Sequence, residues 1–357
     1  MYPLVEINGE KLRHNVKQIV SKCKEAGITS IFGVVKVLAG YQDAINDLIS
    51  GGITHIADSR IENLKNISTK LKKILLRIPM ESEVHDVVKY CDISLNSELE
   101  TIKKLNHAAR INRVIHDIIV MFDLGDLREG IWYTSDYIKF IAQIIELPNI
   151  RLVGIGTNLT CYGSVIPTQE NLSILVRIKE EIERTFNIKL TYISGGNSSS
   201  LPLVYRKQLP KGINNLRIGE AFFLGRETAY GKNLIDCYQD VFILKAQIVE
   251  LKRKPSFPIG ERGFDAFGQV VQYEDKGMMD RAILAIGKQD VYPENLEPLD
   301  KRVKILGASS DHLIVDCTNT DYKVGDIMDF KLSYGGLLQA MTSKYVNKVY
   351  LHNIITP

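Results

Sequence analysis

One lysine stands in an apolar stretch, where a charged side chain needs an explanation. Lys36 follows a run of small and branched residues in GVVKVLAG, at the expected end of a β-strand. Apolar surroundings disfavour an ammonium ion and lower the pKa of the amine, which favours formation of a Schiff base. The alternative is a strand-end lysine whose stem carries its charge to solvent. Lys36 is therefore a candidate reactive amine.

An arginine follows a later strand of the chain. The segment DLGDLREG, residues 123–130, comes directly after an expected strand and contributes Arg128. A guanidinium fork beside a lysine suits a carboxylate or a phosphate group. The alternative is an arginine paired with Asp126 or Glu129 at the surface.

Two further segments have the composition of a phosphate site. SGGNSSS (194–200) and LRIG (216–219) each follow or end an expected strand. Glycines allow close approach of the backbone, and Asn197 and the serines supply hydrogen-bond donors. A Gly/Ser-rich turn without a ligand is the alternative. A reactive amine together with a phosphate site suggests pyridoxal phosphate as the cofactor.

The pattern of the first two thirds of the chain predicts elements that would bring these residues together. Short runs rich in Val and Ile alternate with amphipathic helical patterns, which is typical of parallel β/α units. A (β/α)8 TIM barrel carries its active site at the carboxyl ends of its strands and often holds phosphate after strands seven and eight. A doubly wound sheet is the alternative, although no GxGxxG follows the first strand. The eight expected strands are 31–36, 53–57, 73–78, 92–95, 117–122, 151–155, 189–193 and 215–218.

From about Cys237 the pattern changes to strands without helices. Segments such as VFILKAQIVEL, RAILAIG and HLIVD are separated by turns rich in Pro and Gly. This indicates a compact β domain. We therefore expect a barrel over residues 1–235 and a C-terminal β domain over 236–357, which is also what a length of 357 residues favours.

Composition and charge exclude several classes of protein. The chain is 45% hydrophobic and 24% charged, with 45 Lys and Arg against 42 Asp and Glu, and no basic stripe indicates nucleic acid. Five widely spaced cysteines predict neither a disulfide framework nor a zinc site. No run of 18 apolar residues occurs, so we expect a cytoplasmic protein that does not bind membranes.

These segments, in their order along the chain, resemble the alanine racemase-like fold-type III pyridoxal-phosphate enzymes, and among them the ornithine racemases. The similar segments are VEINGEKLRHNV, VVK, DLGDLREG, GGNSSS, LRIGEAFFLG and TSKYVNKVY. The family's D-T-G-M-x-R-x-G motif implies that Arg128 holds the cofactor and the substrate carboxylate. The resemblance makes Lys36 the cofactor lysine and Arg217 the partner of the pyridine nitrogen. It implies phosphate contacts for Asn197, Ser198, Gly219 and Tyr350.

The chain departs from the alanine enzymes at the position of their second acid/base residue. Their G-Y-A-D-G motif is GKQDV here, so that Lys288 stands where the tyrosine would be. The family tyrosine reaches into the neighbouring subunit's site, so the resemblance implies a homodimer with shared active sites. We predict that Lys288 is the second base. The alternatives are a lysine in a solvent-exposed turn, His312 and Tyr292.

A second departure concerns the substrate. In GASSDHLIVD, Ser310 and Asp311 occupy the substrate-contacting pair of the alanine enzymes. We predict that Asp311 pairs with a terminal ammonium group such as that of ornithine, because alanine would leave the carboxylate unpaired. An aspartate that binds backbone donors at a strand end is the alternative. The stretch also resembles a loop of basic amino-acid decarboxylases, although Ser310 stands where those enzymes use a cysteine.

Together these residues predict a pyridoxal-phosphate-dependent racemase of ornithine or another basic amino acid. Racemisation needs two acid/base groups on opposite faces of Cα, here Lys36 and Lys288. The alternatives are a decarboxylase of basic amino acids, an alanine racemase and a non-catalytic carrier of the cofactor. No metal is expected.

Overall fold

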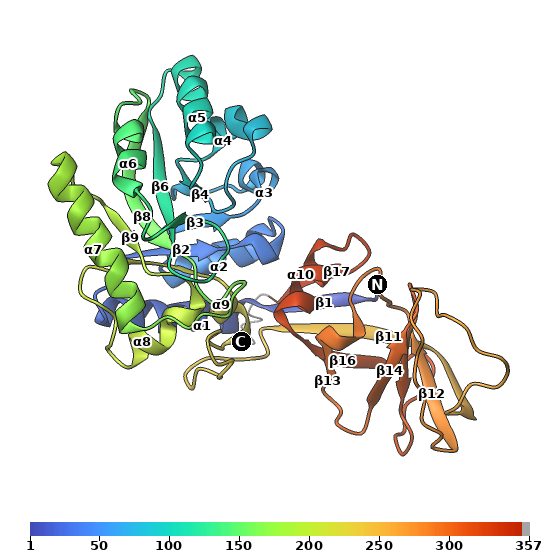
Figure 1. Ribbon diagram of the computed structural model, residues 1–357. Coiled ribbons are helices and arrows are strands. Elements are labelled where there is room, and N and C mark those ends of the chain that lie inside the picture. The colour runs from blue at the N-terminus through green and yellow to red at the C-terminus, as the bar shows by residue number, and fades with distance from the viewer. Residues whose placement is uncertain (352–357) are drawn as a thin grey trace. The chain divides into compact units, whose positions relative to one another are not determined.

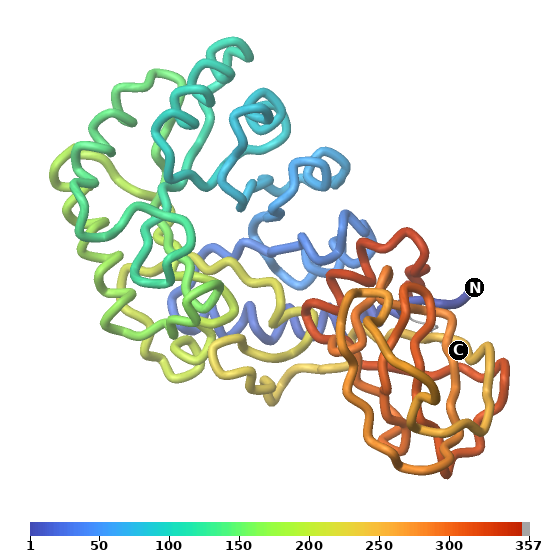
Figure 2. Tube along the Cα trace, turned by 45° about the vertical axis from the view of Figure 1, so that its right-hand side comes forward, coloured from blue at the N-terminus to red at the C-terminus, as the bar shows by residue number. Residues whose placement is uncertain are grey.

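The structure, a computed structural model, describes residues 1–351. Its internal contacts divide the chain into two units. The barrel unit is Glu10–Gln239, and the β unit joins Met1–Gly9 to the residues from Asp240 on. In Figures 1 and 2 the N-terminal strand of the β unit is blue, and the rest of the β unit runs from yellow to red. The barrel unit, which lies between them in the sequence, runs from blue to yellow.

Eight parallel strands close the barrel. Each pairs with its neighbours in the order β2-β3-β4-β5-β6-β8-β9-β10, and β10 pairs with β2 to complete the ring. The short strand β7 (Ile131–Trp132) pairs with β6 outside the ring. The predicted (β/α)8 barrel is confirmed. Its strands are β2 (Ser30–Val34), β3 (His55–Asp58), β4 (Lys73–Leu75), β5 (Ile93–Asn96), β6 (His116–Asp123), β8 (Ile150–Thr157), β9 (Tyr192–Ser194) and β10 (Asn215–Ile218).

Helices connect the strands and bury one apolar face each. In α7, Thr168 caps the first turn by accepting from the backbone N–H of Asn171, and the buried residues recur every three or four positions, at Leu172, Leu175 and Ile178. The α-helices are α1 (Gly9–Glu25), α2 (Gln42–Gly51), α3 (Ile61–Asn66), α4 (Val84–Tyr90), α5 (Leu99–Asn112), α6 (Tyr137–Ile145), α7 (Gln169–Phe186), α8 (Leu201–Tyr205) and α9 (Glu220–Leu224). The 3-10 helices are η1 (Lys36–Leu38), η2 (Glu81–Glu83) and η3 (Ser198–Ser200).

Side chains from the strands fill the barrel, which is therefore a packed core and not a channel. One cluster of buried residues draws on six of the eight strands, and it contains Phe32, Ala57, Ile74, Ile93, Leu95, Ile119, Met121 and Val153. Such burial stabilises the barrel by roughly 25 cal/mol for each Å² of apolar surface removed from water. A core of this kind holds the carboxyl ends of the strands at fixed positions.

The β unit is a mostly antiparallel sheet with the strand order β13-β16-β11-β12-β15-β14. The N-terminal strand β1 pairs with β11 and also, in parallel, with β17. The strands are β1 (Leu4–Asn8), β11 (Phe242–Pro255), β12 (Met278–Leu284), β13 (Leu296–Pro298), β14 (Lys304–Ala308), β15 (Leu313–Asp316), β16 (Ile327–Leu332) and β17 (Asn347–Leu351). The helices are α10 (Tyr334–Thr342) and η4 (Pro293–Asn295).

Two details differ from the sequence analysis. The expected boundary lies at residue 235, whereas the contacts divide the chain after Gln239 and assign Met1–Gly9 to the β unit. The reason is the pairing of β1 with strands more than 230 residues away, which no local pattern reveals. Lys36 lies beyond its strand, because β2 ends at Val34 and Lys36 begins η1. In residues 1–351, no helix is long and apolar enough to cross a membrane.

Candidate active site

Three neighbouring strands of the barrel deliver the predicted cofactor residues to one rim. Strand β10 pairs with both β2 and β9. Lys36 follows β2, Gly219 follows β10 and Asn197 follows β9. The carboxyl ends of parallel strands in a barrel face the same way, so these residues share the catalytic face of the fold.

Lys36 has the properties of a reactive amine. Within residues 1–351 its Nζ atom has no hydrogen-bond or ion-pair partner. Burial lowers the pKa of this amine from its ordinary value, and the positive charge of Arg128 lowers it further. The charges of Asp58 and Glu129 oppose this effect. The result is an ammonium ion that loses its proton more readily than a lysine in water.

Asp58 is a rim carboxylate that the sequence analysis missed. It ends β3 and is fully buried. Its side chain accepts from the backbone N–H of Arg60 at 2.8 Å and from Asn63 Nδ2 at 3.1 Å. Burial raises the pKa of Asp58 to about 6. An apolar strand that ends in aspartate, IAD, was the available signal in the sequence.

The segments after β9 and β10 are joined as a phosphate site would require. Asn197 caps η3, because its Oδ1 accepts from the backbone N–H of Ser199 at 2.8 Å. The Oγ atom of Ser198 accepts from the backbone N–H of Ala221 in α9, at 3.3 Å. At Gly219 a Cβ would lie 2.9 Å from the carbonyl oxygen of Val34, so a glycine is needed for β10 and β2 to approach here.

Arg217 is buried inside the mouth of the barrel. Its guanidinium group donates to Ser194 Oγ, to the carbonyl oxygen of Thr157 at 2.6 Å and to Asn158 Oδ1. Burial lowers the pKa of Arg217 to about 10. The group therefore keeps its charge near neutral pH, and its hydrogen-bond acceptors are all neutral.

Arg128 and Asp126 have separate partners. Arg128 pairs with the adjacent Glu129. Glu129 is one of the two carboxylates that the sequence analysis named as possible partners of this arginine. Asp126 is buried and accepts from four backbone N–H groups of the segment after β8, at 2.9 to 3.1 Å, namely those of Thr160, Cys161, Tyr162 and Val165. Asp126 therefore holds one rim segment against another.

Cys161 is a second rim residue that sequence reasoning missed. It is an exposed, free thiol, and its Sγ atom accepts from Asn197 Nδ2 at 3.3 Å. Its place beside a predicted cofactor residue could have been inferred only from the position of its segment after the sixth barrel strand.

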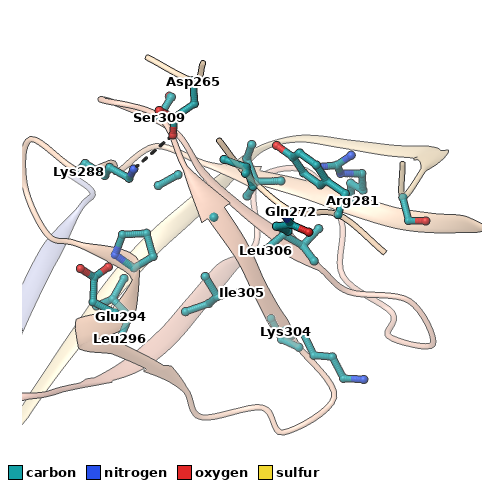
Figure 3. A pocket seen from close by; sticks show the side chains of 18 of the residues that line it. Asp265, Gln272, Arg281, Lys288, Glu294, Leu296, Lys304, Ile305, Leu306 and Ser309 are labelled. Carbon is teal, nitrogen blue, oxygen red and sulfur yellow. Dashed lines mark ion pairs between the residues drawn. The ribbon is translucent and has the colours of Figure 1, made fainter. Parts of the chain in front are cut away.

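Lys288 lies in the β unit, beside a pocket of about 980 Å³ (Figure 3). Its Nζ atom is 3.9 Å from the centroid of the Phe267 ring and 4.0 Å from Asp265 Oδ2. The side chain is only 18% exposed. Lys288 is therefore not a lysine of a solvent-exposed turn, which was its alternative, and its role as a base stays a prediction.

The structure brings Ser310 and Asp311 to Lys288. The backbone N–H of Lys288 donates to the carbonyl oxygen of Ser309 at 2.9 Å, and a Cβ at Gly287 would lie 2.3 Å from the backbone N of Asp311. The hydroxyl of Ser310 donates to Asp311 Oδ1 at 3.1 Å and is the main cause of a lowered pKa of Asp311. Lys288, Ser310 and Asp311 therefore form one cluster.

Tyr350 also belongs to the β unit. It lies in β17 opposite Ile7 of β1. The predicted site residues thus fall into two groups, with the cofactor lysine, the arginines and most of the phosphate contacts in the barrel unit, and Lys288, Ser310, Asp311 and Tyr350 in the β unit.

The residues of the barrel rim fit pyridoxal phosphate. Lys36 is an unpaired and partly buried amine, as capture of the aldehyde requires. Donors suited to phosphate follow β10, which pairs with the strand before Lys36, and β9, the next strand in the ring. In the described part of the chain, no group of three or more His, Cys, Asp or Glu residues is arranged to hold a metal ion.

Comparison with known proteins identifies the class of protein that this fold and rim define. The family described as "Alanine racemase, N-terminal domain" matches residues 7–227, and the chain belongs to it. The predicted family and the predicted class of enzyme, a racemase, are therefore confirmed.

Two curated relatives span nearly the whole chain. An ornithine racemase of Acetoanaerobium sticklandii is 53% identical over 98% of this chain and all of the relative. A lysine racemase of Thermotoga maritima is 40% identical over 98% of this chain and 99% of the relative.

Solved structures agree on the fold. Alanine racemase from Clostridium difficile 630 has a TM-score of 0.72 at 20% identity, and covers 99% of this chain and 97% of its own. Alanine racemase from Streptomyces coelicolor has a TM-score of 0.74 at 15% identity, with 98% of each chain covered. These similarities support the predicted barrel with an added β domain.

Proposed function

We propose that this chain is a pyridoxal-phosphate-dependent racemase that interconverts the L and D enantiomers of ornithine. The observation that carries the proposal is the unpaired, partly buried Lys36 at the barrel rim, beside two segments suited to phosphate. The nearly full-length similarity to an ornithine racemase and a lysine racemase favours a basic amino acid as the substrate.

The cofactor, when bound, withdraws electrons from Cα of the amino acid and so makes its proton removable. Asn197, Ser198, Gly219 and Tyr350 would hold its phosphate group. Arg217 would face its ring nitrogen and, because a guanidinium group barely releases a proton, would leave that nitrogen unprotonated. Arg128 would bind the substrate carboxylate through the N–H groups that its pairing with Glu129 leaves free.

Lys36 is the base on one face of Cα. Its lowered pKa increases the fraction of neutral amine near neutral pH, which a proton acceptor needs. Lys288 is the acid/base group on the other face, held beside Phe267 and Asp265. Two lysines on opposite faces allow a proton to leave one side of Cα and return from the other.

Asp311 selects the substrate by charge. Its carboxylate is 58% exposed and lies on the same loop as Ser310, beside Lys288. The hydrogen bond from Ser310 favours the ionised form, which a terminal ammonium group would recognise. Alanine has no such group, so it would be bound less tightly.

The proposed assembly is a homodimer with shared active sites. A division of the predicted catalytic lysines between two units supports this arrangement, because one subunit's β unit could complete the other's barrel. The five cysteines are free, which supports a reducing compartment such as the cytoplasm.

Incubation of the cofactor-loaded protein with L-ornithine, L-lysine and L-alanine tests the proposal. Chiral chromatography should show the D enantiomer of ornithine and, more slowly, of lysine, with little conversion of alanine. K36A should abolish the conversion and the absorbance band of lysine-bound cofactor, whereas K104A, at an exposed lysine of α5, should keep both. Release of carbon dioxide from ornithine would indicate a decarboxylase instead, and retention of the band by K36A would contradict the assignment of this lysine.

A further inference from the structure

One carboxylate at the barrel rim connects the two arginines of the site. Glu129 Oε1 accepts from Arg128 Nη2 at 2.6 Å, and the same residue also receives Arg128 Nε. Asn158 Nδ2 donates to Glu129 Oε1 as well. Asn158 Oδ1 in turn accepts from Arg217. A continuous chain of hydrogen bonds therefore runs from the segment after β6, through the end of β8, to β10.

The chemistry of these groups permits only one orientation of the Asn158 amide. A carboxylate cannot donate a hydrogen bond and a guanidinium group cannot accept one. The amide nitrogen must therefore face Glu129 and the amide oxygen must face Arg217. Glu129 and Arg217 thereby favour the same orientation of Asn158, and Glu129 holds the amide nitrogen.

Glu129 also balances charge at the rim. Its side chain is 19% exposed, and Arg217 has no carboxylate among its direct hydrogen-bond partners in the described chain. The negative charge of Glu129 favours the charged forms of Lys36, Arg128 and Arg217 alike. The groups that act on the charge of Lys36 are Arg128, Cys161, Asp58 and Glu129.

We propose that Glu129 is a positioning residue of the racemase, which orients Arg128 directly and Arg217 through Asn158. This inference rests on the proposed function, because it concerns the same site. The family motif that matches Arg128 specifies no residue type at the position of Glu129. The hydrogen bonds of this structure give a reason for a carboxylate there.

E129Q removes the charge with little change of shape. A glutamine has one acceptor oxygen where the carboxylate has two, so it loses either the bond from Arg128 Nε or the bonds from Arg128 Nη2 and Asn158. Loss of the charge also lowers the pKa of Lys36 further, so that the neutral amine forms at lower pH.

The first measurement uses no amino acid. The full chain is freed of cofactor, and the rate at which Lys36 takes up pyridoxal phosphate is followed by absorbance from pH 6 to 10. We expect the midpoint of this profile in E129Q to fall by about half a pH unit or more. D117N is the matched control, because Asp117 holds Arg151 in a similar fork, at 2.7 and 2.9 Å, at the amino ends of the strands. Its midpoint should equal that of the wild type.

The second measurement separates charge from geometry. E129D keeps the charge but shortens the side chain, so its midpoint should stay near that of the wild type while the KM for ornithine rises about tenfold through poorer positioning of Arg128. Circular dichroism checks that each variant is folded. Unchanged midpoint and KM in folded E129Q would overturn the proposal, as would an equal shift in D117N. A wild type that takes up no pyridoxal phosphate would instead contradict the proposed function.

Discussion

At the scale of single residues, burial gives ordinary side chains their chemical properties. Lys36 and Arg217 both have lowered pKa values because burial disfavours their charged forms, yet only Lys36 lacks a hydrogen-bond partner within residues 1–351. The lysine is therefore free to react, whereas the arginine is committed to three acceptors. The same physical effect thus supports two different roles.

Substrate selection by Asp311 is a prediction at this scale. In D311N we expect the KM for ornithine to rise about tenfold or more, with alanine affected little, because a neutral amide pairs weakly with an ammonium group. Steady-state kinetics with both amino acids measures the difference. S310A is the matched control, since it removes the hydroxyl that bonds to Asp311 and keeps the charge. Equal losses for ornithine and alanine in D311N would exclude a role in selection.

A buried histidine predicts how stability depends on pH. Burial lowers the pKa of His116 from its ordinary value of 6.5 to about 4, and Ser94 Oγ lies 2.8 Å from its Nε2. Between these two pH values the unfolded chain binds a proton at this position and the folded protein does not, so stability falls as the pH falls from 6.5 to 4.

Replacement of His116 should remove that part of the pH dependence. Between pH 7 and pH 4 the wild type should lose about 3 kcal/mol more unfolding free energy than H116Q, from 1.36 kcal/mol per unit of pKa difference. Urea unfolding across this range measures it, and H85Q, at an exposed histidine of α4, is the control. Parallel curves for the wild type and H116Q would show that the histidine does not contribute.

At the scale of elements, the loops after the barrel strands stabilise one another. Asp126, after β6, accepts from four backbone N–H groups after β8, and Asn197, after β9, donates to the carbonyl oxygen of Leu159 at 3.1 Å. Three rim segments are thereby joined by side chains that accept from or donate to the backbone. The rim depends on these contacts because its loops have few ladder hydrogen bonds of their own.

The Asp126 contact gives a prediction for one element. An asparagine has a single acceptor oxygen, so D126N leaves backbone donors of residues 160–165 without a partner and should destabilise the protein by about 2 to 4 kcal/mol. Hydrogen exchange at residues 160–165 should accelerate and cofactor affinity should fall. D136N, which weakens the cap of α6 at Lys139, is the control and should leave these amides unchanged. Unchanged exchange in D126N would contradict the role of this aspartate.

At the scale of the whole molecule, the predicted catalytic lysines belong to different units of the chain. Lys36 lies in the barrel unit and Lys288 in the β unit. In the proposed dimer, each active site takes one lysine from each subunit. K36A and K288A should therefore each be inactive alone.

A mixture of the two variants tests this arrangement. After refolding together in equal amounts, half of the dimers carry one subunit of each kind, and each of these has one intact site, so about one quarter of wild-type activity should return. Activity assays with gel filtration measure both the recovery and the dimer, and a mixture of K36A with itself is the control. No recovery would contradict shared sites, and full activity of K288A alone would exclude Lys288 as the second base.

Much of the barrel could be predicted because its signals are local. Each of the eight expected strands has a counterpart in the ring, since a buried parallel strand is a short apolar run whatever its neighbours are. The fork of Arg128 and the donors of Asn197 could be inferred from residue types placed after such runs. Asp58 and Cys161 were missed because an acidic residue or a thiol after a strand is common and carries no pattern of its own.

The sequence itself determined the eight barrel strands in their order along the chain, the candidate reactive amine, the candidate phosphate-binding segments and the resemblance to the family, because each is recognised from short segments of the chain. Only the tertiary structure decided that β1 belongs with strands at the far end of the chain, that Glu129 accepts from both Arg128 and Asn158, and that Lys288 and Asp311 are neighbours. These contacts join residues that are distant along the chain or that have several possible partners. The folded backbone selects among those partners, and the burial that it imposes on Lys36 and Arg217 lowers the pKa of both groups.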